Sequence, residues 1–199
     1  MRVAVAVSGR GSNLEALLRA LGPEAPARVV LVLSNRADAP ALERATARGI
    51  ATLALHDHAD GREWLSALEY HGVALLVLAG YIKLVPAEVV ARYRGRILNV
   101  HPALLPAFGG QGMYGRRVHE AVLASGARES GATVHLVDEV YDRGAILGQA
   151  RVPVLPGDDA GSLAARVLEA EHRLLPAAVL AAAAAGHPVP IPEFAESNP

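Results

Sequence analysis

Apolar runs and helical patterns alternate along the first half of the chain. Val3–Val7 is a Val/Ala run typical of a strand that is buried on both faces. Four further strands are predicted, at Arg28–Leu33, Ala51–Leu55, Val73–Ala79 and from Ile97 onward. Between them the spacing of apolar residues predicts helices at Leu14–Leu21, Ala39–Arg48, Asp60–His71 and Pro86–Tyr93. This alternation predicts an α/β fold with a parallel sheet and right-handed crossovers.

The second half has a different pattern, and it changes the predicted sheet. A helix is expected at Arg116–Ser125, followed by two strands, Thr133–Asp138 and Ala145–Pro153, that a short loop connects. A short connection favours antiparallel pairing, so the sheet is expected to be mixed. A long helical stretch then runs to Ala185, and Pro176 is expected to kink or break it.

These elements predict a single domain over residues 1–186, followed by a proline-rich, irregular tail at 187–199. The length of 199 residues is sufficient for a sizeable core, and 20% charged residues are typical of a globular protein. The net charge of −1 argues against a nucleic-acid or membrane-surface partner, because both need a basic face. The chain has no cysteine and no signal-peptide pattern at its start, so we expect a cytoplasmic protein.

A glycine loop, S-G-R-G-S-N at Ser8–Asn13, connects the first strand to the first helix. Free backbone N–H groups and the helix dipole favour an anion at such a position, although an ordinary tight turn would have the same pattern. Ser12 and Glu15 have the spacing of a capping box. Leu14 occupies the third glycine position of a dinucleotide fingerprint, which favours a mononucleotide over NAD.

The stretch I-L-N-V-H-P, starting at Ile97, carries the strongest candidate chemistry. Asn99 and His101 are two residues apart on a predicted strand, so their side chains should point to the same face. Pro102 should end the strand there, and ligands bind at the carboxyl end of such sheets. An amide can donate to an oxyanion and an imidazole can transfer a proton, but either residue could equally be structural.

Three carboxylates, Asp138, Glu139 and Asp142, crowd the loop after the strand T-V-H-L-V-D. At least two of them are expected to be solvated. A carboxylate that lay beside His101 would favour the imidazolium and raise the pKa of His101. Spacing alone does not establish that these loops meet. The sequence has no metal-ligand pair at helical spacing, so no metal is expected.

Four motifs together resemble the phosphoribosylglycinamide formyltransferases, folate-dependent enzymes of purine biosynthesis. These are S-G-R-G-S-N, A-D-A around Asp38, N-V-H-P-A-L-L-P and G-A-T-V-H-L-V-D-E-V-Y-D-R-G-A-I-L. They occur in order between Arg2 and about Gly186. The resemblance implies a Rossmann-like formyltransferase fold with a mixed sheet. It also implies that 10-formyltetrahydrofolate gives its formyl group to the amine of glycinamide ribonucleotide.

The resemblance also implies roles for individual residues. Asn99, His101 and Asp142 match the family's catalytic positions, with Asn99 also contacting the folate. The positions that match the ribonucleotide site are Gly11, Ser12, Asn13 and Glu171, the last as a contact of the ribose. Those that match the folate site are Arg62, Ile82, Lys83, Leu84 and Val85.

Some positions depart from the family pattern. Lys83 stands where arginine is common, Ala145 follows R-G where G-G-P or T-G-P is frequent, and the loop Phe108–Tyr114 is longer than in some relatives. They concern the folate contacts and not the three catalytic matches. The alternatives are a related formyltransferase or deformylase, which would carry a further domain, and a non-catalytic Rossmann-type nucleotide-binding domain. A homodimer is compatible with the sequence.

Overall fold

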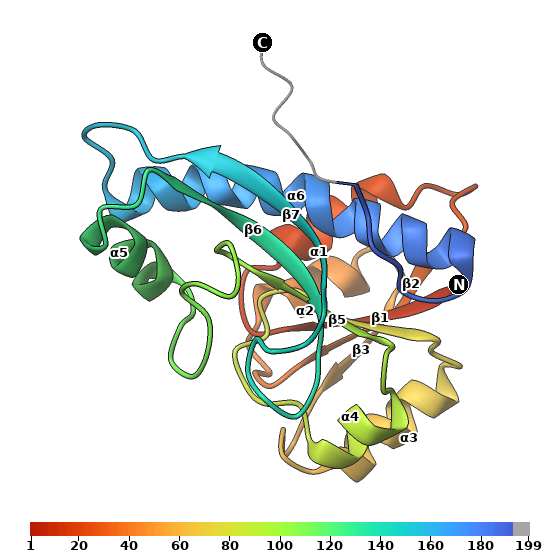
Figure 1. The fold of residues 1–199 in the computed structure, drawn as a ribbon. Coiled ribbons are helices and arrows are strands. Elements are labelled where there is room, and N and C mark those ends of the chain that lie inside the picture. Colours follow the sequence, from red (N-terminus) through yellow and green to blue (C-terminus); the bar gives the residue numbers. More distant parts are fainter. Residues whose placement is uncertain (193–199) are drawn as a thin grey trace.

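A seven-stranded sheet in the order β3-β2-β1-β4-β5-β6-β7 runs through the protein (Figure 1). The computed structural model describes residues 1–192. The strands are β1 (Arg2–Val7), β2 (Arg28–Ser34), β3 (Ala51–Ala54), β4 (Leu75–Leu78), β5 (Ile97–His101), β6 (Glu129–Leu136) and β7 (Ile146–Pro153). The helices are α1 (Ser12–Ala20), α2 (Pro40–Thr46), α3 (Gly61–Tyr70), α4 (Ala87–Arg92), α5 (Arg116–Ala124) and α6 (Ala160–Ala185).

The first five strands pair in parallel, and the last two are antiparallel to their neighbours in the sheet. The predicted mixed sheet in an α/β fold is therefore confirmed. In the antiparallel pair of β5 and β6, Asn99 lies opposite His135 and His101 opposite Thr133. This register matters for the site, because it places polar side chains of two strands next to each other.

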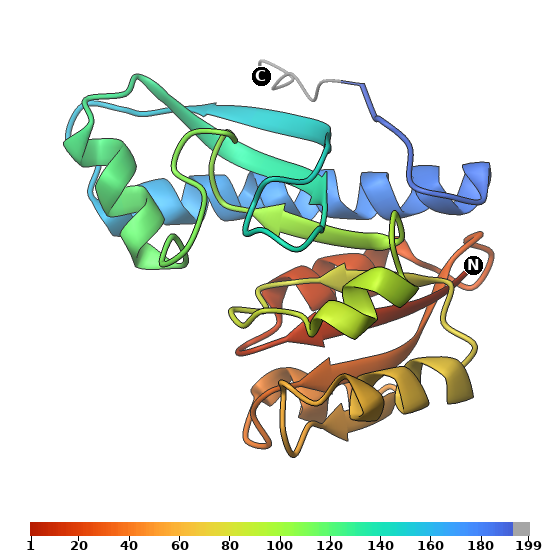
Figure 2. The same ribbon diagram turned by 60° about the horizontal axis from the view of Figure 1, so that its bottom comes forward.

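Side chains of β1 alternate between two apolar layers, as its sequence predicts. Val3, Val5 and Val7 pack in the cluster formed with α1, α2 and α6. Ala4 and Ala6 belong to the other cluster, with α3 and α4. Figure 2 shows α6 running along the sheet beside β6 and β7, and Figure 1 shows α3 and α4 on the opposite side of the sheet from α6. After Arg2, the side chains of β1 are Val and Ala, which are small, so helices can pack closely on both faces of this strand.

The predicted capping box at Ser12 and Glu15 is wrong. The residue that caps α1 is Gly11, with φ of 78°, and no side chain caps the helix. The carboxylate of Glu15 instead pairs with Arg48 at 2.8 Å and Arg44 at 3.6 Å. Arg44 on α2 and Arg48 just after it are better partners for this carboxylate than one backbone N–H, and the spacing rule considers only residues within the same helix.

Helix α6 continues through Pro176, so the predicted break does not occur. A proline removes only its own backbone donor, and Pro176 is buried in the helix surface that packs on the sheet. A true capping box, formed by Asp159 and Ser162, starts this helix. After α6 the chain has no helix or strand as far as residue 192, and Ile191 donates its N–H to the carbonyl of Leu147 at 2.8 Å. The predicted tail beyond residue 192 lies outside the described residues.

Most predicted boundaries agree with the structure to within two residues. The larger error concerns β6, which begins at Glu129 instead of Thr133. Its first residues, E-S-G-A, are weak strand formers, and they become a strand because β7 pairs with them along their full length.

Candidate active site

A cavity of about 810 Å³ lies where β1, β4 and β5 end. The loop from β1 to α1 and helix α6 form one end, and the segments after β4 and β6 form the other. The predicted site residues in its wall are Ser12, Asn13, Ile82, Lys83, Leu84, Val85, Asn99, His101, Asp142 and Glu171. Gly11 and Arg62 do not line it. Residues from both ends of the sequence therefore converge on one space.

Asn99 and His101 both point to this cavity from the end of β5. Leu98 and Val100 alternate with them along the strand and pack into the cluster with α6. The predicted shared face of Asn99 and His101 is therefore confirmed. The strand ends at His101, directly before Pro102, as expected. Strand alternation thus gives the site two polar groups while the opposite face of β5 stays in the core.

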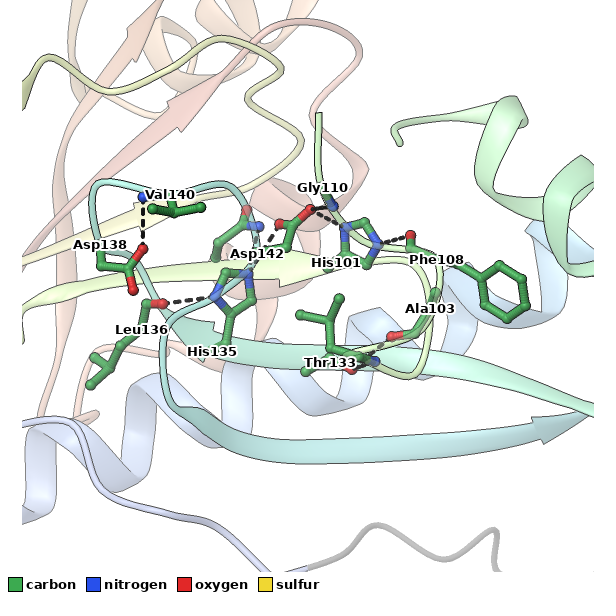
Figure 3. Close-up of polar contacts among 12 residues, drawn as sticks. His101, Ala103, Phe108, Gly110, Thr133, His135, Leu136, Asp138, Val140 and Asp142 are labelled. Carbon is green, nitrogen blue, oxygen red and sulfur yellow. Dashed lines mark hydrogen bonds and ion pairs between the residues drawn. The ribbon is translucent and has the colours of Figure 1, made fainter. Parts of the chain in front are cut away.

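Asp142 lies between two imidazoles (Figure 3). Its Oδ2 is 3.5 Å from Nδ1 of His101, and its Oδ1 is 3.4 Å from Nε2 of His135. The backbone N–H of Gly110 donates to Oδ2 at 2.8 Å. Asp142 has a φ of 55°, a left-handed conformation that aspartate tolerates better than most residues. The loop after β6 and the loop after β5 therefore meet at one carboxylate.

The Nε2 atom of His101 donates to the backbone carbonyl of Phe108 at 2.8 Å. This bond leaves Nδ1 facing Asp142, so a second proton on the ring would lie against a carboxylate. Burial lowers the pKa of His101, and the charge of Asp142 and the Phe108 carbonyl offset it only in part. The charge of Asp142 raises the pKa of His101 as expected, but burial outweighs it, because His101 is only 3% exposed and burial disfavours the imidazolium.

Asp142 itself is ionised. Burial alone would raise its pKa, but contacts with His135, the charge of His101 and the Gly110 N–H together lower the pKa below its usual value. The site thus holds a negative charge beside the imidazole of His101. A proton that reaches His101 during a reaction is stabilised by this charge.

His135 is a site residue that the sequence reasoning missed. Its Nδ1 donates to the carbonyl of Leu136 at 2.7 Å, and its Nε2 lies 3.0 Å from Nδ2 of Asn99. The Asn99 amide nitrogen therefore donates one hydrogen to Nε2 of His135, which leaves the second amide hydrogen for a ligand. The available signal was the alternation of T-V-H-L in a strand predicted beside β5, but its register could not be read from the sequence.

The glycine loop and α6 form the other end of the cavity. A Cβ on Gly11 would lie 2.6 Å from that of Ala41, so only glycine fits at this left-handed position. The amide of Asn13 donates to Oε2 of Glu171 at 2.6 Å. Glu171 is 7% exposed, and burial raises its pKa to about 7 although the Asn13 bond opposes this. Polar groups of the first and the last helix are thereby joined.

The end beyond β4 is more apolar. Ile82, Lys83, Leu84 and Val85 all line it, and the backbone N–H of Ile82 donates to the hydroxyl of Ser8. Arg62 lies apart from this wall, with its exposed guanidinium paired to Asp60 at 2.9 Å at the start of α3. The role of Arg62 in folate binding therefore stays a prediction with no support from the cavity wall.

Among residues 1–192 no group of three or more His, Cys, Asp or Glu side chains is placed to hold a metal ion.

A profile of the formyl transferase family matches residues 1–179. The chain belongs to this family. A chloroplastic phosphoribosylglycinamide formyltransferase of Arabidopsis thaliana is 46% identical over 181 residues, which cover 87% of this chain. The match spans 62% of the plant protein's own length. The Escherichia coli phosphoribosylglycinamide formyltransferase is 37% identical, with coverage of 88% and 84% of the two chains.

Solved structures agree with this relationship. The phosphoribosylglycinamide formyltransferase of Anaplasma phagocytophilum superposes on this chain with a TM-score of 0.87 and 39% identity, and covers 92% of it. The share of the Anaplasma chain that is covered is 87%. The enzyme of Brucella melitensis has a TM-score of 0.83, 46% identity and coverages of 92% and 95%. The Rossmann-like formyltransferase fold is therefore established.

Proposed function

We propose that this chain transfers the formyl group of 10-formyltetrahydrofolate to the primary amine of glycinamide ribonucleotide. The products are formylglycinamide ribonucleotide and tetrahydrofolate. The observation that carries the proposal is the convergence of Asn99, His101 and Asp142 on one cavity, between a glycine loop and an apolar end. The proteins named above that share this fold and 37–46% of their residues are phosphoribosylglycinamide formyltransferases.

The first step needs a group that stabilises an oxyanion. The lone pair of the amine attacks the formyl carbon, and the C=O electron pair moves to oxygen. The free amide hydrogen of Asn99 is the donor that can face this charge, because the two ring nitrogens of His101 already face the Phe108 carbonyl and Asp142. Removal of one such donor typically costs about 100- to 1000-fold in rate.

The second step moves a proton. The attacked amine must lose a proton, and the folate nitrogen must gain one as its bond to the formyl carbon breaks. His101 is suited to deliver this proton because its low pKa makes the imidazolium a good acid, while Asp142 stabilises the charge. The proton lost by the amine, directly or through a water held by Asp142, protonates His101, so the net change is one proton moved from the amine to the folate nitrogen.

The cavity has one region that suits the phosphate and ribose of the ribonucleotide and another that suits the ring system of the folate. The N-terminus of α1, with Gly11, Ser12 and Asn13, suits a phosphate, and Glu171 suits a ribose hydroxyl. Ile82, Lys83, Leu84 and Val85 suit the ring system of the folate.

No helix among residues 1–192 is long and apolar enough to cross a membrane. A cytoplasmic location, the lack of a nucleic-acid partner and a homodimer stay predictions from the sequence.

The test mixes the purified protein with glycinamide ribonucleotide and 10-formyltetrahydrofolate and follows tetrahydrofolate release by absorbance. We expect release only when the ribonucleotide is present. Release without ribonucleotide, with formate as the second product, would identify a deformylase instead. Lack of turnover under both conditions would refute the proposed function.

A further inference from the structure

A row of three polar side chains crosses the sheet at the catalytic imidazole. His101 of β5 lies opposite Thr133 of β6, and Thr133 lies opposite Gln149 of β7, the strand at the edge of the sheet. Side chains that are directly opposite on antiparallel strands project from the same face. Thr133 is fully buried and Gln149 is half-buried, but neither lines the cavity. These two polar groups are therefore placed to act on His101 and not on a ligand.

The hydroxyl of Thr133 uses its whole capacity for hydrogen bonds. It donates to the carbonyl of Ala103 at 2.6 Å and accepts from the backbone N–H of Leu105 at 3.1 Å. It also accepts from Nε2 of Gln149 at 2.9 Å, so its one hydrogen and both lone pairs are occupied. The same Nε2 donates to the carbonyl of Leu105 at 2.9 Å. Thr133 and Gln149 thus bind the backbone of the loop that follows β5.

This loop carries the carbonyl that orients His101. The carbonyl belongs to Phe108, and it accepts from Nε2 of His101 at 2.8 Å (Figure 3). Phe108 has a φ of 56°, a left-handed conformation that is uncommon for a bulky residue. Such a conformation persists only where the surrounding structure holds it. The position of the Phe108 carbonyl therefore depends on what anchors the loop.

Packing does not enclose this loop on all sides. A second cavity of about 510 Å³ borders it, with Leu104, Ala107 and Phe108 in the wall. Ala107 is exposed, and the other two are only half-buried. A segment with few buried contacts shifts easily once its hydrogen bonds are removed. The bonds from Thr133 and Gln149 are therefore needed to keep the loop in place.

We propose that Gln149 is a positioning residue, which fixes the orientation of His101 from the edge strand of the sheet. It acts together with Thr133 on the loop, and the loop presents the Phe108 carbonyl to the imidazole. The inference rests on the function proposed above. While this carbonyl holds Nε2, Nδ1 stays directed at Asp142, and the proton donor keeps its alignment. A displacement of about 1 Å can cost about 100-fold in rate, even when its cause lies far from the chemistry.

The test compares Gln149→Met with wild type, since methionine keeps the length of the side chain and removes its amide. We expect kcat to fall about 10- to 100-fold, with the KM for both substrates unchanged because Gln149 does not line the cavity. In proton NMR, the Nε2–H of His101 should exchange with water about 10-fold faster, because its bond to the Phe108 carbonyl is weakened. A side chain that only supports the fold would change the Tm and leave this exchange as it is.

Arg151→Met is the matched control. Arg151 lies on the same strand as Gln149, and its guanidinium pairs with the exposed carboxylate of Glu129 at 3.1 Å. The variant introduces the same side chain but removes no bond to the loop after β5. It should keep the kcat of wild type and the same exchange of the His101 Nε2–H.

Two variants of Thr133 test the network by a second route. Thr133→Val keeps the shape and loses the hydroxyl, so it should reproduce both changes of Gln149→Met. Thr133→Ser keeps the hydroxyl and should restore the wild-type values. An unchanged kcat or an unchanged His101 N–H exchange in Gln149→Met would overturn the inference and leave the proposed function standing. Lack of turnover in wild type would instead refute the proposed function, and the N–H exchange alone would then decide whether Gln149 orients His101.

Discussion

The carboxylate of Asp142 lies 3.5 Å from Nδ1 of His101, and the bond from Nε2 of His101 to the Phe108 carbonyl fixes the orientation of the ring. The two residues belong to different loops, which the N–H of Gly110 joins by its bond to the same carboxylate. A proton on Nδ1 would therefore point at a negative charge. This arrangement supports a cationic imidazole during the reaction without favouring it beforehand.

Replacement of Asp142 by asparagine keeps the shape of the side chain and removes its charge. We expect kcat to fall by about 100- to 10,000-fold, the range of general acid–base contributions, with the ribonucleotide Kd unchanged. His101→Ala should have an effect of similar size. Steady-state kinetics and calorimetry separate the two quantities, and a loss of ribonucleotide affinity without a loss of kcat would contradict a catalytic role.

Asp158→Asn is a suitable control for the charge change. Asp158 pairs with Arg166 at 2.7 Å, outside the cavity wall. The variant should therefore lower the Tm and leave kcat at the wild-type value. An equal loss of kcat in this variant would show that the Asp142 result reflects general damage to the fold.

Asn99→Ala should lower kcat by about 100- to 1000-fold, because it removes the amide that donates to the oxyanion. His135→Phe should cause a smaller loss, since the Asn99 amide would remain but lose the partner that orients it. If orientation is the only role of His135, the double variant should be no slower than Asn99→Ala alone. Additive losses in rapid-mixing kinetics would instead show that His135 also acts through another contact, such as that of its Nε2 with Asp142 at 3.4 Å.

The raised pKa of Glu171 predicts how stability depends on pH. The pKa is about 7 in the folded protein and 4.5 for an ordinary glutamate, so between these values the folded state holds more protons than the unfolded chain. The free energy of unfolding should therefore fall as pH rises through this window, by at most about 3 kcal/mol. Glu171→Gln should abolish the decline and be the more stable protein above pH 7.

Urea unfolding of both proteins at about pH 5 and about pH 8 measures this difference. Glu169→Gln, an exposed residue on the same helix, is the control and should keep the pH dependence of wild type. If wild type and Glu171→Gln lose stability equally between the two pH values, Glu171 is ionised in the folded state and the predicted linkage is absent.

Gly11→Ala should damage the phosphate end of the cavity. An alanine at φ of 78° costs about 1–2 kcal/mol, and its Cβ would meet that of Ala41 at 2.6 Å. We expect a lower Tm and a weaker affinity for glycinamide ribonucleotide, with tetrahydrofolate binding retained. Gly22→Ala, where the new methyl group meets no atom within 4 Å, is the control and should preserve both affinities.

The sequence predicted the elements of this fold well because each carries a local signal. Alternating small apolar residues predicted β1, and Pro102 predicted the end of β5 with Asn99 and His101 on one face. The motifs also predicted that Asp142 belongs with these two residues, although no local pattern implied that their loops meet. That knowledge came from resemblance and not from periodicity.

Other features depend on distances that a sequence does not contain. His135 reaches the site only through the register of β6 on β5. Glu15 does not cap α1 as predicted but pairs with Arg44 of α2 and with Arg48 just after that helix. The pKa of His101 was expected to rise because of a nearby carboxylate, but the depth of burial decides its direction.

The bond between Asn13 and Glu171 joins residues 158 positions apart, on the first and the last helix. During synthesis on the ribosome, the ribonucleotide end of the cavity therefore cannot form until α6 has emerged and packed against α1. A ligand that binds between these helices stabilises their docking, and so it selects chains that have completed folding. Under the proposed function, ribonucleotide binding would therefore favour chains in which α1 and α6 have docked.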